Sequence, residues 1–172
     1  MNLNYQLKFY DYWHLSSGLS GGAKFNSIVI KDSNRLPFAP GKTIKGLLRE
    51  MANLIDQNFT KICFGDKECA GSCYFSNAIL EQQEAGYIIA NSLQPYLYDI
   101  IAQTSIDDNG NAKDDSLRVI EVVIPLKLQG EIRDIPDEFE CKMRKTLSMI
   151  KQIGLNRNRG LGRCEFCIEE QK

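Results

Sequence analysis

The chain has 172 residues and nearly balanced charge, with 21 Lys and Arg against 22 Asp and Glu. Its apolar share of 43% and charged share of 25% are those of a soluble globular protein, and this length favours one domain, residues 1–172. No run of about 18 apolar residues occurs, so the composition excludes a transmembrane helix. Six Cys, with no secretory signal ahead of them, favour a reducing cytosol and hence a cytoplasmic protein.

Period-2 alternation over residues 4–10 predicts a first strand, and apolar residues spaced by three and four predict a helix over 43–59. Residues 61–73 form a Cys-rich loop, and 87–98 fit either a strand or a helix. Asp107-Asp108-Asn109-Gly110 is typical of a hairpin turn. Further strands are expected at 27–31, 73–80, 103–106, 117–132 and 163–169, and a second helix at 137–153. This order predicts a ferredoxin-like α+β fold, with helices on one face of a sheet.

Charge is segregated along the chain although it balances overall. Residues 142–163 hold seven Lys and Arg and no acid, and residues 31–49 hold five against the single acid Asp32. Such segregation can build a basic stripe that binds a polyanion. The alternative is an ordinary solvated helix face.

The strongest motif is the glycine-rich loop GLNRNRGLGR at residues 154–163. Its glycines permit tight turns, and Arg157, Arg159 and Arg163 supply bidentate donors for phosphate. The loop follows a predicted helix and precedes a strand, the reverse of a dinucleotide-binding fingerprint. A plain helix-to-strand turn is the alternative interpretation.

A second basic motif, PGKTIKGLLR at residues 40–49, opens the first predicted helix. It is not a P-loop, because Leu36 stands where that motif requires glycine. Free amides at a helix start, together with Lys42, Thr43, Lys45 and Arg49, could hold phosphate. A simple helix cap is the alternative.

In this order, the motifs resemble the RAMP superfamily, specifically the backbone subunits of type III CRISPR effector complexes. Four stretches carry the resemblance: WHLSSG at 13–18, LPFAPGKTIKG at 36–46, TSID at 104–107 with SLRVIE at 116–121, and RGLG at 159–162. They span nearly the whole chain.

The resemblance implies a ferredoxin-like (RRM-type) palm with an inserted β-hairpin thumb at about residues 103–121. Copies of such subunits stack along a guide RNA (crRNA), and each thumb enters the guide–target duplex. It therefore implies guide RNA, target RNA, other effector subunits and copies of this chain as partners. Leu117 and Arg118 of the thumb, with the two basic motifs, are the expected RNA contacts. The acidic thumb tip suits a basic neighbouring subunit.

The resemblance also implies where a catalytic residue would lie. Family members that cut target RNA use an Asp, together with a divalent cation, in the loop that corresponds to the one after His14. Residues 13–31 of this chain contain no Asp or Glu; Leu19, Ala23 and Asn26 occupy the plausible places, and Asp32 is the nearest carboxylate. Without a carboxylate nothing local holds Mg²⁺, so we expect a subunit that does not itself cut. The alternative is a CRISPR repeat RNA-processing endoribonuclease on the same fold, with His14 as general base.

Cys63, Cys69 and Cys73 are the best metal candidates, because three thiols within eleven residues could wrap one tetrahedral Zn²⁺. The fourth ligand would be His14 or Cys141. Some related CRISPR subunits resemble this chain in having a zinc site in the same loop. Otherwise Cys63 and Cys73 are core residues. A third hypothesis is a zinc-stabilised assembly module with no role in RNA binding.

Overall fold

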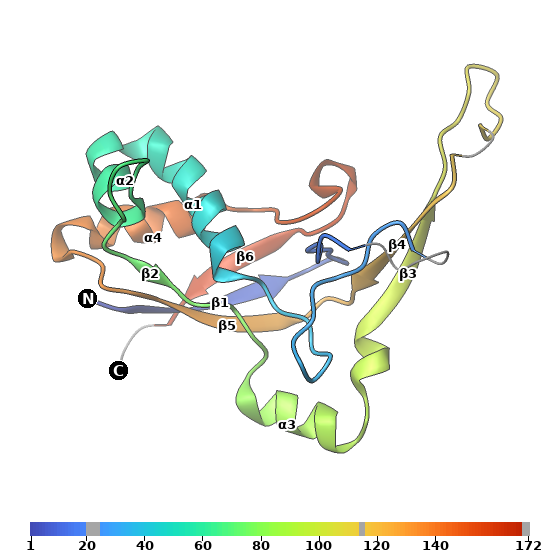
Figure 1. Ribbon diagram of the computed structural model, residues 1–172, viewed down its shortest axis with the longest axis horizontal. Helices are drawn as coiled ribbons and strands as arrows, with labels where there is room; N and C mark the ends of the chain where they lie inside the picture. The colour runs from blue at the N-terminus through green and yellow to red at the C-terminus, as the bar shows by residue number, and fades with distance from the viewer. Residues whose placement is uncertain (20–24, 114–115, 170–172) are drawn as a thin grey trace.

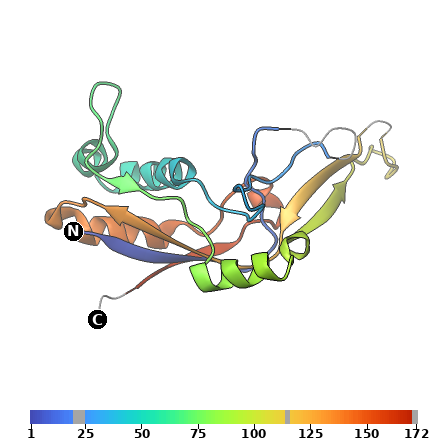
Figure 2. The same cartoon turned by 60° about the horizontal axis from the view of Figure 1, so that its bottom comes forward.

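The computed structural model describes residues 1–19, 25–113 and 116–169 and contains a palm and a projecting hairpin (Figure 1). The palm is a four-stranded antiparallel sheet with the strand order β2-β5-β1-β6. Its strands are β1 (Leu3–Phe9), β2 (Tyr74–Phe75), β5 (Lys127–Arg133) and β6 (Cys164–Ile168). Helices α1 (Gly41–Ile55) and α4 (Glu140–Met149) cover one face (Figure 2). The chain order β1-α1-β2-β5-α4-β6 confirms the predicted ferredoxin-like fold.

Alternation along β1 decides which face of the sheet is covered. Leu3, Tyr5, Leu7 and Phe9 are buried, whereas the residues between them face outward. The buried side chains of α1, among them Ile44 and Leu48, belong to the same apolar cluster. Burial of these side chains contributes roughly 2 kcal/mol each, which fixes the helix layer on the sheet.

The helix predicted over residues 43–59 is two helices. α1 ends at Ile55, and Asp56 adopts an extended backbone that starts α2 (Gln57–Phe64). The Asp56 carboxylate accepts a hydrogen bond from the Phe59 amide, with an N–O distance of 3.0 Å. It also forms an ion pair with Lys142 Nζ of α4 at 2.5 Å. The prediction of one helix was wrong because an N-capping Asp interrupts the apolar pattern without changing its period. The first part of the predicted Cys-rich loop is therefore helical.

The strand predicted over residues 117–132 is also divided. β4 (Arg118–Val123) ends before Pro125, which has no amide hydrogen to donate to a neighbouring strand, and β5 begins at Lys127.

Other predicted elements also differ from the structure. Residues 27–31 and most of 73–80 form only isolated bridges instead of the predicted strands. The ambiguous stretch 87–98 contains the end of α3 (Gln82–Ala90) and a 3₁₀ turn (Gln94–Leu97). The second predicted helix begins as a 3₁₀ turn (Asp137–Phe139) before α4.

The hairpin is a separate two-stranded sheet that we call the thumb, formed by β3 (Tyr98–Gln103) and β4. It projects from the palm in Figure 1, and the described residues 104–113 and 116–117 lie beyond its paired strands. Its paired strands run from Tyr98 to Val123, so the hairpin extends beyond the predicted bounds of 103–121 at both ends. No helix among the described residues is long and apolar enough to cross a membrane.

Candidate nucleic-acid interface

The glycine-rich loop (residues 154–163) is held tightly against the palm at both ends. Gly154 and Gly162 have φ angles of +99° and +71°, which residues that carry a side chain rarely adopt. A Cβ on Gly154 would lie 2.3 Å from the His14 carbonyl oxygen, and one on Gly162 only 1.9 Å from that of Ile153. The Ile153 amide also donates to the Gly162 carbonyl at 2.9 Å. Both glycines are therefore required by the close backbone approach.

Arg157 and Arg159 lie at the exposed end of this loop, on a single 3₁₀ turn (Arg157–Arg159). Asn156 and Gly160, both left-handed, flank the turn. Neither guanidinium pairs with a carboxylate of residues 1–19, 25–113 or 116–169. Two unpaired, planar cations on a fixed turn suit bidentate contact with phosphate.

Arg163 differs from the other two arginines. Its guanidinium pairs with Asp11 at 3.0 Å and lies 5.5 Å from the centre of the Tyr10 ring. Binding a phosphate there would require exchange of one anion for another. Arg163 is thus a weaker candidate for a phosphate contact than Arg157 or Arg159.

Leu117 and Arg118 lie where β4 begins, at the end of the thumb that is farther from the palm. The Leu117 side chain is 63% exposed. Arg118 is opposite Gln103 in the β3–β4 ladder, and Gln103 accepts a hydrogen bond from Asn156 of the glycine-rich loop at 3.1 Å. Arg118 therefore lies close to the loop that carries Arg157 and Arg159.

The α1 cations form a separate group. Lys42, Lys45 and Arg49 follow one helix face, and Lys45 Nζ lies 5.9 Å from the centre of the Phe75 ring in β2. The glycine-rich loop leads into β6 instead, and β2 and β6 are opposite edges of the sheet. The two basic motifs are thus not joined into one cluster.

The start of α1 is also less open than the sequence predicts. The Gly41 amide donates to Asn77 Oδ1 at 2.9 Å, and the Thr43 amide donates to the Pro40 carbonyl at 2.9 Å. Gly41 is required here because a Cβ would lie 2.2 Å from the Phe75 carbonyl oxygen. Phosphate binding at α1 would depend mainly on the three cationic side chains.

The two weak catalytic candidates are both occupied by structural contacts. His14 is fully buried; its Nδ1 lies 2.6 Å from the Glu121 carbonyl oxygen and its Nε2 lies 2.9 Å from Ser27 Oγ. Because a carbonyl only accepts, Nδ1 carries a proton. Asp32 Oδ1 accepts the amides of Asn34 and Leu36, both at 2.8 Å. Ala23 lies outside the described residues, Leu19 is exposed, and Asn26 bonds to Val119 of the thumb.

Glu121 is a polar residue whose role the sequence analysis missed. Its mostly buried carboxylate accepts the Val29 amide at 3.0 Å and Lys31 Nζ at 2.7 Å. Its carbonyl holds His14, so one residue of β4 connects the thumb to two palm segments. An acid inside the apolar stretch VIEVV was the available signal, because a buried carboxylate needs partners.

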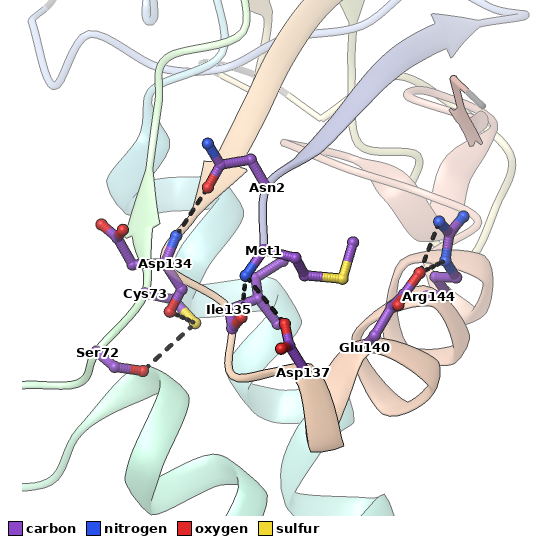
Figure 3. Close-up of polar contacts among 9 residues, drawn as sticks. All are labelled: Met1, Asn2, Ser72, Cys73, Asp134, Ile135, Asp137, Glu140 and Arg144. Carbon is purple, nitrogen blue, oxygen red and sulfur yellow. Dashed lines mark hydrogen bonds and ion pairs between the residues drawn. The ribbon is translucent and has the colours of Figure 1, made fainter. Parts of the chain in front are cut away.

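The Cys-rich loop does not bring its three thiols together. Cys63 and Cys73 are buried neighbours, with the Cys73 amide donating to the Cys63 carbonyl at 3.1 Å, whereas Cys69 is exposed. The hydrogen bond between the thiols, with burial, raises the pKa of Cys63. Figure 3 shows Cys73 between Ser72 and the Asp134 carbonyl. Across the described part of the chain, no three His, Cys, Asp or Glu side chains gather closely enough to hold a metal.

The arrangement also separates the proposed fourth ligands from this loop. His14 is engaged by Glu121 and Ser27, and Cys141 is exposed on α4. The residues as they stand do not form a tetrahedral set, so zinc stays a prediction from the sequence. Metal analysis of freshly purified chain tests it: one zinc per chain, lost in Cys73→Ser, would support the site, and metal-free protein would contradict it.

Asp66 sets the pH dependence of the same loop. Hydrogen bonds from the Cys69 and Glu68 amides, with Lys61 nearby, lower the pKa of Asp66 to about 2. A lowered pKa means that this carboxylate stabilises the loop above about pH 4, and that the stabilisation is lost as the pH falls toward 2. We expect the Cys69 and Glu68 amide resonances to titrate with a midpoint near 2. In Asp66→Asn this titration should vanish; a midpoint near 4 in the wild type would contradict the assignment.

The fold and these motifs together define a RAMP protein. Residues 7–165 match the RAMP superfamily, and the chain belongs to that family. A chain in the cryo-EM structure of the type III-B Cmr-beta bound to cognate target RNA superimposes with a TM-score of 0.79 at 10% identity, covering 98% of this chain and 97% of that one. A chain of the apo type III-B Cmr-beta gives a TM-score of 0.77 at 11% identity, with coverage of 98% and 97%. No curated protein matches the sequence.

Proposed function

We propose that this chain is an RNA-binding structural subunit of a type III CRISPR ribonucleoprotein in antiviral defence, acting in the cytoplasm. The observation that carries the proposal is that Arg157 and Arg159 are exposed beside the thumb of a RAMP palm and form no ion pair with a carboxylate of the described residues. One of the two similar chains comes from the type III-B Cmr-beta bound to cognate target RNA, which supports RNA and other effector subunits as partners.

The guide RNA backbone is the proposed ligand of the glycine-rich loop. Arginine forks recognise phosphates without reading bases, and a scaffold that accepts any spacer requires such contacts. Lys42, Lys45 and Arg49 face the other edge of the palm and would bind a separate stretch of RNA. The thumb, with Leu117 exposed, would meet the guide–target duplex or a neighbouring subunit.

A subunit that does not cut RNA is the second part of the proposal. Residues 13–31 contain no carboxylate, and His14 is buried with both ring nitrogens engaged. A general base must reach the proton that it removes, and His14 is enclosed by Glu121 and Ser27. We therefore expect neither repeat RNA nor a guide–target duplex to be cleaved by the wild-type chain with Mg²⁺.

A denaturing gel distinguishes this proposal from the endoribonuclease hypothesis. Wild type, His14→Ala and His14→Asn are incubated with labelled repeat RNA; the Asn variant retains a donor for the Glu121 carbonyl and guards against loss of the fold. Equal, uncut RNA in all lanes is expected. A product made by the wild type and absent from both folded variants would assign His14 as the base and contradict the proposal.

A further inference from the structure

One face of the thumb is contacted at three successive positions. Asp99, Ile101 and Gln103 alternate along β3 and therefore share a face. Their ladder partners on β4 are Val122, Ile120 and Arg118. Every side-chain contact described next falls on this face.

The middle contact is apolar. Leu161 of the glycine-rich loop is only 7% exposed and packs with Ile120 and Val122, with Ile101 at the margin. This cluster is separate from the main core of the palm. A small, isolated cluster depends strongly on each member, because no other side chains fill the space that a truncation leaves.

Two hydrogen bonds flank the apolar contact. Asn156 Nδ2 donates to Gln103 Oε1 at 3.1 Å on the tip side, and the Tyr12 hydroxyl donates to Asp99 Oδ2 at 2.9 Å on the base side. The bond to Asp99 raises the pKa of Tyr12, so the phenol remains a donor at neutral pH. The three contacts follow the β3 strand from base to tip.

The same loop is fixed to the palm. The Gly162 amide donates to the Tyr12 carbonyl at 2.8 Å, and the Leu155 amide donates to the His14 carbonyl at 2.9 Å. Figure 1 shows the loop, in red, on the side of the palm from which the thumb projects. The loop that carries Arg157 and Arg159 thus contacts the palm on one side and the thumb on the other.

We propose that the glycine-rich loop braces the thumb on the face opposite the Glu121 side chain and so helps to set its orientation, with Leu161 and Asn156 as the positioning residues. The phosphate-binding arginines and the thumb then move as one body, so that RNA bound at Arg157 and Arg159 also orients Arg118 and Leu117. This consequence for RNA rests on the proposed function. The brace itself does not.

Amide hydrogen exchange of the free protein tests the brace without RNA. The variant combines Leu161→Ala with Asn156→Gly, because Gly retains the left-handed backbone of Asn156 (φ +56°) while removing the amide. Exchange in β3 and β4 should become about tenfold faster or more, while β1 and β5 remain unchanged as internal references. Equal acceleration everywhere would mean global loosening and would overturn a specific brace, as would unchanged exchange in the thumb.

Two controls isolate the contacts. Leu155→Ala removes the same side chain from the same loop at a position that is 42% exposed and outside the thumb cluster, and it should leave thumb exchange unaltered. Asn156→Asp should restore slow exchange relative to Asn156→Gly, because the Gln103 amide can rotate and donate to the new carboxylate. Fast exchange in the Leu155 control, or no rescue by Asp, would contradict the assignment.

Single-stranded RNA of mixed sequence tests the coupling. RNA should slow exchange of β3 and β4 in the wild type, and this protection should be lost in the double variant although Arg157 and Arg159 still bind. RNA that binds neither protein, with a faster thumb in the variant, would uphold the brace and overturn the proposed function. Protection that persists in the variant would overturn the coupling.

Discussion

Replacing Arg157 and Arg159 together by alanine is expected to weaken RNA binding about 10- to 100-fold at moderate salt. Each arginine that leaves a phosphate removes roughly 0.7 from the slope of log K against log salt for a single strand, so the double change should lower the slope by about 1.4. The physical reason is that both guanidiniums are exposed on a fixed turn and pair with no carboxylate in the part of the chain that the structure describes. Titration of labelled RNA at several salt concentrations measures both quantities.

The matched control removes two cations elsewhere. Lys61→Ala with Lys67→Ala makes the same change of charge at two exposed lysines, one in the last turn of α2 and one in the loop that follows, and should alter affinity little. The loss in the arginine variant should be similar for RNAs of unrelated sequence, because phosphate contacts carry no sequence information. A strongly sequence-selective loss, or an equal loss in the lysine control, would contradict binding at the glycine-rich loop.

Gly162→Ala is expected to be the most destabilising single change in the loop, lowering the free energy of unfolding by about 3 kcal/mol or more. The added Cβ would meet the Ile153 carbonyl oxygen at 1.9 Å, at a backbone φ of +71°. The neighbouring atom is backbone, so it cannot move aside as a flexible side chain would. Urea unfolding of the wild type and the variant measures the difference.

Gly160→Ala separates the clash from the backbone strain. Gly160 also has a positive φ, +88°, but its Cβ would meet nothing within 4 Å. Only the left-handed conformation opposes this substitution, at a cost of about 1 kcal/mol. Equal destabilisation by Gly162→Ala and Gly160→Ala would show that the backbones of Ile153 and Gly162 do not pack as closely as the structure indicates.

Local patterns in the sequence predicted much of this fold. Alternation over residues 4–10 predicted β1, and the closing strand and the ferredoxin-like order were also predicted correctly. These features depend on periodicity and turn residues, which are properties of neighbouring positions. The division at Asp56 was missed because the apolar spacing continues through the cap.

The candidate site depends more on long-range contacts, and these were less predictable. The sequence identified both basic motifs but not that α1 faces β2 while the glycine-rich loop leads into β6. It likewise did not reveal that Cys69 lies apart from Cys63 and Cys73. Nor did it reveal that the Glu121 carboxylate accepts hydrogen bonds from the Val29 amide and from Lys31 Nζ. The spacing of residues along a chain predicts contacts only within a single helix or strand. The strand order therefore had to come from the structure.

The most direct test of the central claim is to purify the chain together with the products of its neighbouring genes and to sequence any nucleic acid that accompanies it. Short RNAs that share a common repeat-derived end, together with protein partners, are the predicted result. A folded chain that carries no RNA, alone or with its partners, would contradict the assignment of this protein as a guide-binding subunit.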